Sequence, residues 1–459
     1  MALIKSISGI RGTIGGQKGD NLTPIDIVEC TAALGQWMKE QGAPLKVVVG
    51  RDGRISGKIV SQLAVHTLLA LGIDVIDLGL STTPTVEMAV PHLQAGAGII
   101  FTASHNPKNW NALKFLNQQG EFISKSAGAR LLDIIAAGDL HYASVENLGQ
   151  YQKKQGVIDW HIEQILALPL VQAKLIQKKQ FKVVVDAINS TGAISVPPLL
   201  EKLGCETILL NGTVDGNFAH NPEPLPTNLT QLAEAVVREK ADLGIAVDPD
   251  VDRLAFVCED GSMFGEEYTL VAVADYYLQQ SPGNTVSNLS STRALRDVTE
   301  KNGGQYHASA VGEVNVVEKM KAVQAVVGGE GNGGIIVPEL HYGRDALAGI
   351  ALFLSHLAAS NKSIAQLRAT FPDYQMVKDK IALSPALDVD EVIKQLHERY
   401  KSEDCNTIDG LKINFRDSWV HLRKSNTEPI IRVYAEAATE EAAKALVEQI
   451  KQEALAQRT

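Results

Sequence analysis

Three aspartates at alternate positions, Asp248, Asp250 and Asp252, follow an apolar run at residues 243–247. In an extended turn, alternate side chains can point at one place, and carboxylate oxygens are the ligands that hard divalent cations prefer. A solvated acidic turn is the alternative reading. Three like charges beside an apolar strand repel one another, however, unless a cation offsets them. The spacing therefore predicts a metal site.

A calcium-binding EF-hand loop is excluded, although Glu259 stands at the twelfth position counted from Asp248. The sixth position of that loop must be a glycine to make its sharp turn, and here it is Arg253. The flanking residues also have the pattern of strands, whereas an EF-hand is flanked by helices.

A second loop, Thr-Ala-Ser-His-Asn-Pro at residues 102–107, follows the apolar run at residues 97–101 and places Ser104 beside His105. The glycines that flank a hydrolase nucleophile are absent, and an ordinary Ser/Asn/Pro turn is the alternative. A serine hydroxyl can also carry a phosphoryl group, whose charge a nearby divalent cation would offset. The metal loop therefore favours a functional Ser104.

Two further loops have the composition of ligand-binding segments. Residues 328–334 are rich in glycine around Glu330 and Asn332, side chains that can hydrogen-bond to the hydroxyls of a sugar. Residues 423–429, with Arg432 close behind, combine guanidinium, hydroxyl and amide groups that suit a phosphate. A flexible surface turn and a basic surface turn are the respective alternatives.

The elements that must position these loops repeat along the chain. A strand, a helix and a second strand are expected over residues 46–78, 182–210 and 284–310. A further strand follows each copy, at residues 97–101, 243–247 and 322–327. Buried apolar strands alternating with helices indicate parallel sheets. Such sheets carry their ligand loops at the carboxyl ends of strands, so we expect three loops to face one cleft.

The composition changes after residue 372. Helices are expected at residues 389–400 and 440–454, with strands at 411–415, 419–422 and 430–435. The fold class predicted is α/β: three related βαβ-type domains with mixed, mainly parallel sheets and a C-terminal α+β domain, arranged around a central cleft. The four domains are predicted to cover residues 1–150, 151–254, 255–372 and 373–459.

Composition excludes several classes of protein. The 459 residues carry a net charge of −10, and 5% are aromatic, which argues against nucleic-acid binding and a basic membrane anchor. The four cysteines form no CxxC pair, so a reducing cytoplasm is expected. No secretory segment is recognised at the N-terminus. The apolar stretch 347–359 is too short to span a bilayer and is expected to be a core helix.

Phosphoserine, metal, sugar and phosphate loops in this order resemble the α-D-phosphohexomutase superfamily, which includes phosphoglucomutases, phosphomannomutases and phosphoglucosamine mutases. Residues 102–107 and 248–253 (Asp-Pro-Asp-Val-Asp-Arg) together carry the most specific part of the resemblance. Residues 8–12 (Ser-Gly-Ile-Arg-Gly) resemble the N-terminal element of the family, and residues 50–54 (Gly-Arg-Asp-Gly-Arg) the next one. The resemblance covers essentially the whole chain.

The resemblance implies a role for each matching residue. Ser104 would be a phosphoserine that donates and regains the phosphoryl group, and its phosphate would hold Mg²⁺ together with Asp248, Asp250 and Asp252. The catalytic residues implied are Ser104, His105, Arg11, Arg253 and Lys114, with Lys114 as the proton carrier. Glu330 and Asn332 would bind the sugar. The non-reacting phosphate would be held by Arg423, Ser425, Asn426, Thr427 and Arg432.

Two positions depart from common family forms. The sugar loop often reads Glu-x-Ser-Gly-His, and here Asn332 and Gly334 replace the serine and the histidine. Residues 111–114 read Asn-Ala-Leu-Lys in place of a frequent Asn-Gly-x-Lys. His341 is the candidate to fill part of the histidine gap, with an ordinary surface histidine as the alternative.

The substrate is inferred from the same comparison. Asparagine at position 332 resembles acetylglucosamine-phosphate mutases, and Arg-Lys-Ser at 423–425 resembles bacterial phosphoglucosamine mutases. We therefore expect an isomerase-class phosphotransferase that interconverts glucosamine 6-phosphate and glucosamine 1-phosphate, activated by a sugar 1,6-bisphosphate. Glucose or mannose phosphate is the alternative substrate, and a catalytically silent sugar-phosphate-binding regulator or a metal-dependent phosphatase the alternative protein. A monomer or homodimer is expected.

Overall fold

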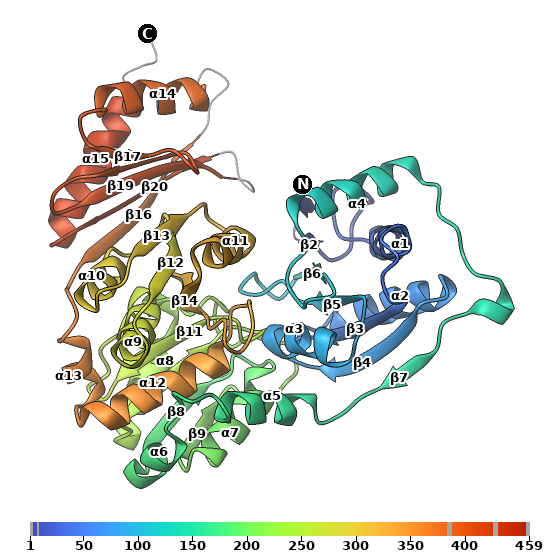
Figure 1. Cartoon of the computed structure of the whole chain (residues 1–459), viewed down its shortest axis with the longest axis horizontal. Coiled ribbons are helices and arrows are strands. Elements are labelled where there is room, and N and C mark those ends of the chain that lie inside the picture. The colour runs from blue at the N-terminus through green and yellow to red at the C-terminus, as the bar shows by residue number, and fades with distance from the viewer. Residues whose placement is uncertain (1–2, 7–8, 383–387, 426–429, 456–459) are drawn as a thin grey trace.

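The computed structural model describes residues 3–6, 9–382, 388–425 and 430–455, which form four sheets (Figure 1). Three of these sheets share one arrangement. A central strand has a parallel neighbour on each side, and an antiparallel strand pairs with one of these neighbours. The fourth sheet is antiparallel throughout. The predicted fold class is confirmed.

The first unit has a seven-stranded sheet in the order β1-β2-β6-β5-β3-β4-β7. Helices α1, α2 and α4 pack on one face of this sheet and α3 on the other. The strands are β1 (Ile4–Ser6), β2 (Gly9–Thr13), β3 (Lys46–Arg51), β4 (Asp74–Leu80), β5 (Ala97–Phe101), β6 (Trp110–Leu116) and β7 (Tyr151–Lys153). The helices are α1 (Pro24–Glu40), α2 (Gly57–Ala70), α3 (Thr83–His92) and α4 (Lys125–Ala137).

The second and third sheets, β11-β10-β8-β9 and β15-β14-β12-β13, repeat the order β6-β5-β3-β4. Their strands are β8 (Lys182–Asp186), β9 (Glu206–Leu210), β10 (Leu243–Val247), β11 (Leu254–Cys258), β12 (Asn284–Asn288), β13 (Tyr306–Ser309), β14 (Ala325–Glu330) and β15 (Gly334–Ile336). The α-helices are α5 (Val157–Leu166), α6 (Ala173–Lys179), α7 (Gly192–Lys202), α8 (Thr230–Glu239), α9 (Glu266–Gln280), α10 (Ala294–Lys301), α11 (Glu313–Val323), α12 (Ala346–Ser360) and α13 (Ile364–Arg368). The border predicted at residue 254 falls on β11, which pairs with β10.

One strand begins and ends later than expected. The run predicted at residues 322–327 is β14 at Ala325–Glu330, because residues 322 and 323 still belong to α11. Gly328 lies within this strand, and α11 packs so tightly over it that a larger residue would not fit: an added Cβ would lie 2.6 Å from Met320 Sδ. The sugar loop is therefore shorter than predicted, and Glu330 is the last residue of a strand.

Helix α12 lies in a core that the second and third units share. Its residues 346–358 are buried, as expected for the apolar stretch around them. One hydrophobic cluster contains strand residues of both sheets together with α9 and α12. The aromatic rings of Phe256, Phe264 and Phe353 meet at its centre, with centroids 3.8 Å apart for the stacked pair Phe256–Phe353. Among the helices described, none is long and apolar enough to cross a membrane.

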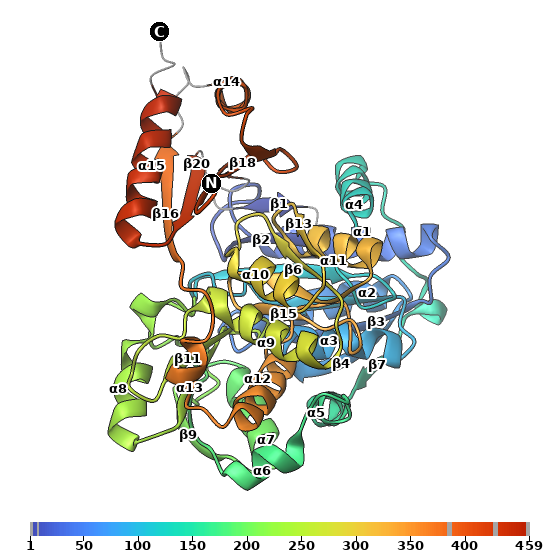
Figure 2. The ribbon, with the colours of Figure 1, turned by 60° about the vertical axis from the view of Figure 1, so that its left-hand side comes forward.

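The C-terminal unit is a five-stranded antiparallel sheet in the order β16-β20-β19-β18-β17. Two strands of this unit were not expected from the sequence: β16 (Gln375–Ala382), half of whose residues are exposed, and the three-residue β17 (Asp404–Asn406). The other elements are β18 (Leu411–Asn414), β19 (Trp419–Lys424), β20 (Ile430–Ala437), α14 (Val389–Arg399) and α15 (Glu440–Leu455). This unit lies beside the third one, joined to α13 by a single segment (Figure 2).

The shared core yields a prediction about stability. Phe353→Ala removes the ring that contacts both Phe256 and Phe264, and we expect it to lower the free energy of unfolding by about 3–5 kcal/mol. Chemical denaturation followed by circular dichroism measures the change. Val145→Ala, at a side chain on the surface, is the control and should leave the midpoint nearly unchanged. A Phe353 variant as stable as the wild type would contradict the central position of this ring.

Candidate active site

Ser104 lies in the loop between β5 and β6, and its side chain is buried. Its φ of +48° is a left-handed conformation that non-glycine residues adopt rarely and that gathers at functional sites. The amide of Ser104 donates to Thr102 Oγ1 at 2.9 Å, and Thr102 Oγ1 donates to Asp52 Oδ2 at 2.6 Å. These two hydrogen bonds tie the backbone at Ser104 to Asp52.

Arg54 fixes the same loop from the first βα turn. Its guanidinium donates to four backbone carbonyls within residues 104–110 and to Asp52 Oδ2 at 3.0 Å. The side chains of Arg54 and Asp52 are both fully buried. A guanidinium carries five N–H donors in a rigid fork, which suits it to hold several acceptors at once.

The aspartate triad, Asp248, Asp250 and Asp252, lies between β10 and β11 with all three side chains fully buried. Val251 has a φ of +63°, a rare conformation for a β-branched residue, and the turn brings carboxylate oxygens of the triad within 4.8 Å of one another. Ser104 Oγ donates to Asp248 Oδ2 at 2.6 Å. The loops of the first and second units therefore meet.

The charges of the triad are strongly coupled to their surroundings. Burial, together with the charges of Asp252 and Asp250, raises the pKa of Asp248 well above its ordinary value. Burial acts in the same direction on Asp250, but Lys114, whose Nζ lies 2.8 Å from Asp250 Oδ2, holds its pKa below the ordinary value. Burial disfavours the ammonium of Lys114, yet Asp250 and Asp252 raise the pKa of Lys114.

The triad fits a divalent cation. Oδ1 of Asp250 and Oδ1 of Asp252 are buried without a hydrogen-bond partner in the part of the chain that the structure describes. Buried carboxylate oxygens without partners are costly unless a cation or a donor reaches them. An all-oxygen donor set, with Ser104 Oγ beside it, matches the preference of Mg²⁺.

Arg344 is a second cation at the triad, and the sequence did not single it out. Its Nη2 donates to Asp252 Oδ2 at 2.7 Å, its Nε to Glu313 at 2.9 Å and its Nη1 to Glu330 at 3.0 Å. Burial opposes its charge, but the carboxylates of Asp252 and Glu313 raise the pKa of Arg344. The side chain crosses Gly334, where an added Cβ would lie 2.3 Å from Arg344 Cδ.

The repeat contains a signal for two other residues that the sequence analysis missed. Thr83 follows β4, and its Oγ1 donates to Asp250 Oδ2 at 2.6 Å. Glu313 follows β13 and binds Arg344. Both residues begin the helix after the second strand of their unit, α3 and α11. Comparing this turn between the predicted repeats would have flagged both positions.

Glu330 and Asn332, the predicted sugar-binding residues, lie at and just after the end of β14. Glu330 accepts hydrogen bonds from Asn288 Nδ2 at 2.9 Å and from the amide of Gly312 at 3.2 Å. Burial opposes its charge, but Arg344 holds the pKa of Glu330 below its ordinary value, so the side chain is a carboxylate. Asn332 Oδ1 accepts from the amide of Gly334 at 3.2 Å.

Arginines from three units approach one another. Burial, followed by the charges of Arg253 and Arg432, lowers the pKa of Arg11. Burial also lowers the pKa of Arg423, opposed by Asp409 and reinforced by Arg432. The Nε atoms of Arg11, Arg253 and Arg423 are buried and have no hydrogen-bond partner among the described residues. Buried cations that face one another are stabilised when anions lie between them.

The predicted phosphate loop is only partly described. Arg423 on β19 pairs in register with Arg432 on β20, and the amide of Ser425 donates to the carbonyl of Ile430 at 3.0 Å. Two residues assigned to this loop, Asn426 and Thr427, lie outside the described residues.

Two histidines named from the sequence lie in different surroundings. His105 Nδ1 is 3.4 Å from Ser104 Oγ, and burial, with the charges of Arg253 and Arg11, keeps its pKa well below the ordinary value. His341 was the candidate for the histidine missing from the sugar loop. Its Nε2 lies 3.3 Å from Asp345 instead, and its side chain is largely buried. The space beside Gly334 belongs to Arg344.

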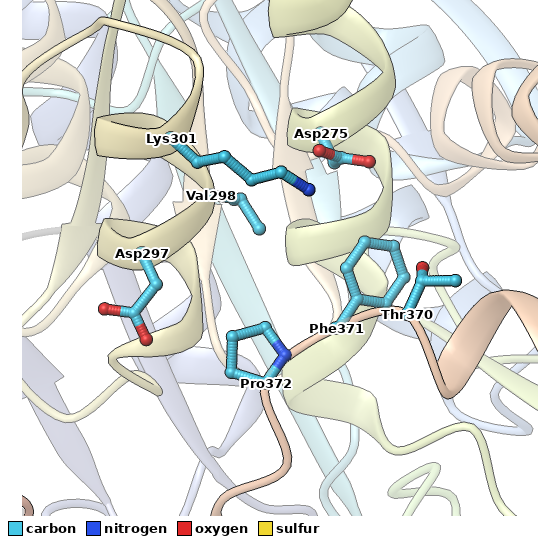
Figure 3. A pocket seen from close by; sticks show the side chains of 7 residues that line it. All are labelled: Asp275, Asp297, Val298, Lys301, Thr370, Phe371 and Pro372. Carbon is cyan, nitrogen blue, oxygen red and sulfur yellow. The ribbon is translucent and has the colours of Figure 1, made fainter.

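A cavity of about 390 Å³ lies elsewhere, between α9, α10 and the segment that leads to the C-terminal unit (Figure 3). Its lining includes Asp275, Asp297, Lys301 and Phe371, and none of the residues predicted to bind substrate or metal. This cavity is not part of the site just described.

Comparison with known protein families shows to which family the chain belongs. Models of the phosphoglucomutase/phosphomannomutase family match its alpha/beta/alpha domain I at residues 3–141, domain II at 159–261, domain III at 265–374 and the C-terminal domain at 376–453. This chain belongs to the phosphoglucomutase/phosphomannomutase family. The resemblance inferred from the sequence is thereby confirmed.

Individual relatives agree with this assignment. The chain is 35% identical, over 95% of its length and 96% of the relative's, to a phosphoglucomutase/phosphomannomutase of Thermococcus kodakarensis. It is 33% identical, over 98% and 99% respectively, to a phosphoglucosamine/phosphogalactosamine mutase of Sulfurisphaera tokodaii. The crystal structure of a family protein from Burkholderia thailandensis superposes with a TM-score of 0.86 at 26% identity, covering 99% of this chain and 97% of that one. The chain is an isomerase-class mutase.

The buried Arg54–Asp52 pair gives a prediction about this mutase. Arg54→Met leaves Asp52 buried without its cation and frees the carbonyls of residues 104–110, so we expect a loss of about 3–5 kcal/mol in unfolding free energy. Thermal and chemical denaturation measure it. The matched control, Arg130→Met, breaks an arginine–carboxylate pair on the surface and should leave the unfolding midpoint almost unchanged. Equal effects of the two substitutions would contradict the role given to Arg54.

Proposed function

We propose that this mutase interconverts glucosamine 6-phosphate and glucosamine 1-phosphate through a phosphoserine at Ser104 and a sugar bisphosphate intermediate. The observation that carries the proposal is the contact between Ser104 Oγ and Asp248 Oδ2, which joins a strained serine loop to a buried aspartate triad. A structural serine has no need of three buried carboxylates. A phosphorylated serine needs the cation that those carboxylates would hold.

The transfer step depends on position and charge. The bond between phosphorus and Ser104 Oγ breaks as a bond forms between phosphorus and a sugar oxygen, and the serine oxygen leaves on the side opposite to the attack. Mg²⁺ held by the triad would offset charge on the phosphoryl group and on the departing serine oxygen. Arg11 and Arg253, whose buried Nε atoms have no protein partner in the described chain, would bind the phosphoryl oxygens.

A proton must leave the sugar hydroxyl as the phosphoryl group arrives. Lys114 is the carrier proposed from the sequence, and its raised pKa makes it an ammonium while the triad is unneutralised. A cation in the triad would cancel much of that effect, because Asp250 and Asp252 cause the rise in pKa. His105, whose lowered pKa leaves it neutral, lies 3.4 Å from Ser104 Oγ and is the second group within reach.

The second half of the reaction requires the intermediate to turn over, so that its other phosphate meets Ser104. The far phosphate then needs a site that accepts either end of the sugar. Arg423 and Arg432, which are in register on β19 and β20, offer such a site. Their unit is connected to α13 by one segment, which would allow it to move toward the first three units during the reaction (Figure 2).

The amino-sugar preference is supported by charge at the sugar loop. Glu330 stays anionic because its pKa is lowered, and an anionic side chain can bind the ammonium group of glucosamine. A relative at 33% identity is named a phosphoglucosamine/phosphogalactosamine mutase. The relative at 35% identity is named a phosphoglucomutase/phosphomannomutase, so glucose and mannose phosphates are the competing substrates.

Substrate preference is tested by turnover of the three sugar 1-phosphates with a sugar 1,6-bisphosphate and Mg²⁺. We expect kcat/KM for glucosamine phosphate to exceed the values for glucose and mannose phosphate, because only the amino sugar presents a cation to Glu330. Glu330→Gln, which keeps the shape and removes the charge, should narrow this ratio. Comparable kcat/KM values for all three sugar phosphates would contradict the proposed preference for glucosamine phosphate.

The phosphoserine is tested with Ser104→Ala. We expect this variant to lose turnover while it keeps most of its affinity for sugar phosphate, because the carrier oxygen is removed and the binding arginines remain. Mass spectrometry should find a phosphoryl group on the wild type after incubation with bisphosphate, and none on the variant. Ser126→Ala, on the surface, is the control.

Two other outcomes of these experiments would indicate that this protein has a different function. Stoichiometric release of inorganic phosphate would indicate a phosphatase, because a mutase returns the group to its serine. Absence of both turnover and phosphoserine in the wild type would indicate a regulator that only binds sugar phosphates.

A further inference from the structure

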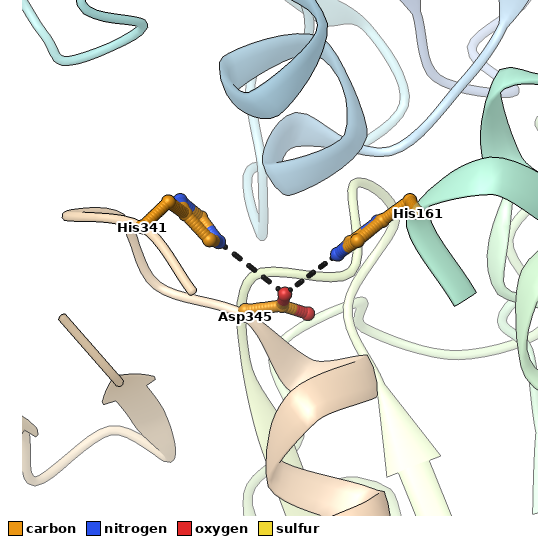
Figure 4. Close-up of side chains that lie close together, drawn as sticks. All are labelled: His161, His341 and Asp345. Atoms are coloured by element: carbon orange, nitrogen blue, oxygen red, sulfur yellow. Dashed lines mark hydrogen bonds and ion pairs between the residues drawn. The ribbon is translucent and has the colours of Figure 1, made fainter. Parts of the chain in front are cut away.

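Two histidines converge on one carboxylate at the junction of the first three units. His161 Nε2 lies 2.8 Å from Asp345 Oδ2, and His341 Nε2 lies 3.3 Å from the same oxygen. The two rings reach this oxygen from different directions, at 85° to one another (Figure 4). His161 belongs to α5, His341 to the segment before α12, and Asp345 to the N-cap of α12. The side chains of His161 and Asp345 are almost completely buried.

The other carboxylate oxygen of Asp345 is already engaged. Oδ1 accepts hydrogen bonds from the first amides of α12, those of Leu347 and Ala348, at 2.9 and 3.1 Å. This cap fixes the orientation of the carboxylate and directs Oδ2 toward the two imidazoles. All three inward-facing atoms come from groups that bind transition metals in proteins, imidazole nitrogen and carboxylate oxygen.

The outward nitrogen of each histidine faces an oxygen on α3. His161 Nδ1 lies 2.9 Å from Thr85 Oγ1, and His341 Nδ1 lies 3.5 Å from Glu87 Oε2. Thr85 and Glu87 are both buried. Histidines that bind metals nearly always donate their second N–H to a carboxylate, carbonyl or similar acceptor, which leaves the lone pair of the inner nitrogen for the metal. His161 has this arrangement with Thr85, and His341 Nδ1 faces Glu87 Oε2 without a hydrogen bond between them.

Glu87 provides an independent observation. Its side chain is 1% exposed, and neither carboxylate oxygen accepts a hydrogen bond from any residue that the structure describes. Burial, with the charges of Glu313 and Asp252, raises the pKa of Glu87 well above its ordinary value. A buried carboxyl group without a hydrogen bond is costly in free energy. A metal ion on Nε2 would polarise His341 and make its Nδ1–H a stronger donor to Glu87.

We propose that His161, His341 and Asp345 form a second metal site, for Zn²⁺ or a similar transition metal, with Thr85 and Glu87 as the outer hydrogen-bond partners. Two nitrogens and one oxygen distinguish this site from the aspartate triad, whose all-oxygen donors favour Mg²⁺. The ion binds α5 and the N-terminus of α12 directly, and α3 through Thr85 and Glu87. It cross-links the first three units and leaves the C-terminal unit free.

Cobalt is the probe that separates the two sites, because Co²⁺ held by two imidazoles and a carboxylate in near-tetrahedral geometry absorbs visible light much more strongly than octahedral Co²⁺ on oxygens. The full chain, saturated with Mg²⁺ to fill the triad, is titrated with Co²⁺ and then with Zn²⁺. We expect one Co²⁺ per chain with this absorption, its displacement by Zn²⁺, and a higher thermal midpoint with Zn²⁺ bound.

The variants assign the ion to its ligands. His161→Gln and His341→Gln should abolish the absorption and the thermal shift, and Glu87→Gln should weaken Zn²⁺ binding about 10-fold or more. His66→Gln, at an exposed histidine of α2, and Asp250→Asn, in the triad, should leave both signals unchanged.

Three results would overturn the proposal: no tightly bound Co²⁺ or Zn²⁺ on the wild-type chain, an ion retained in both histidine variants, or loss of the ion in Asp250→Asn. The first would mean that the cluster is only a hydrogen-bonded junction. If neither histidine variant folds, X-ray absorption of the zinc-loaded wild type decides, since the site requires two imidazole ligands.

Discussion

The constraint on which this structure depends is the burial of three carboxylates in one turn. Asp248, Asp250 and Asp252 lie fully inside the molecule, where their mutual repulsion is poorly screened. Cations from the other units, Lys114 from the first and Arg344 from the third, partly offset this repulsion. The charge of these carboxylates, which the proposed function assigns to a metal ion, also holds the three units together through Lys114 and Arg344.

The repeated strand order explains how so many loops reach the same place. In each of the three units one candidate loop joins the last parallel strand of the repeat (β5, β10 or β14) to the antiparallel strand after it, so the loops of Ser104, of the triad and of Glu330 occupy equivalent positions. The second βα turn contributes as well, with Thr83 in the first unit and Glu313 in the third. Three copies of one local geometry, turned toward each other, supply donors, acceptors and charges that a single copy lacks.

The packing around this centre is unequal. The second and third units share one apolar core around α12, which holds the metal loop and the sugar loop in a common frame. The C-terminal unit instead meets the third through polar contacts, such as Lys412 Nζ donating to the carbonyl of Leu289 at 2.8 Å. An apolar core resists rearrangement, whereas a polar interface tolerates it. This difference suits the proposed role of the C-terminal unit, which is to bind the far phosphate and to release it after the reaction.

The sequence by itself determined the local parts of this protein. The β-branched runs specify β3 and β8, and the apolar run at residues 243–247 specifies β10. The spacing of Asp248, Asp250 and Asp252 specifies a turn with converging carboxylates, because all of these patterns depend only on residues near in the chain. Strand β16 was not recognisable, since half of its side chains are exposed, only Ile381 is fully buried, and its register is set by pairing with β20. Only the tertiary structure decided that Arg344, not His341, fills the space beside Gly334, and that His341 joins His161 at Asp345. The contact between His161 and Asp345 joins two units, and the path of the Arg344 side chain depends on how its loop folds back on β15. A local sequence pattern carries no information about which side chain will pack against it.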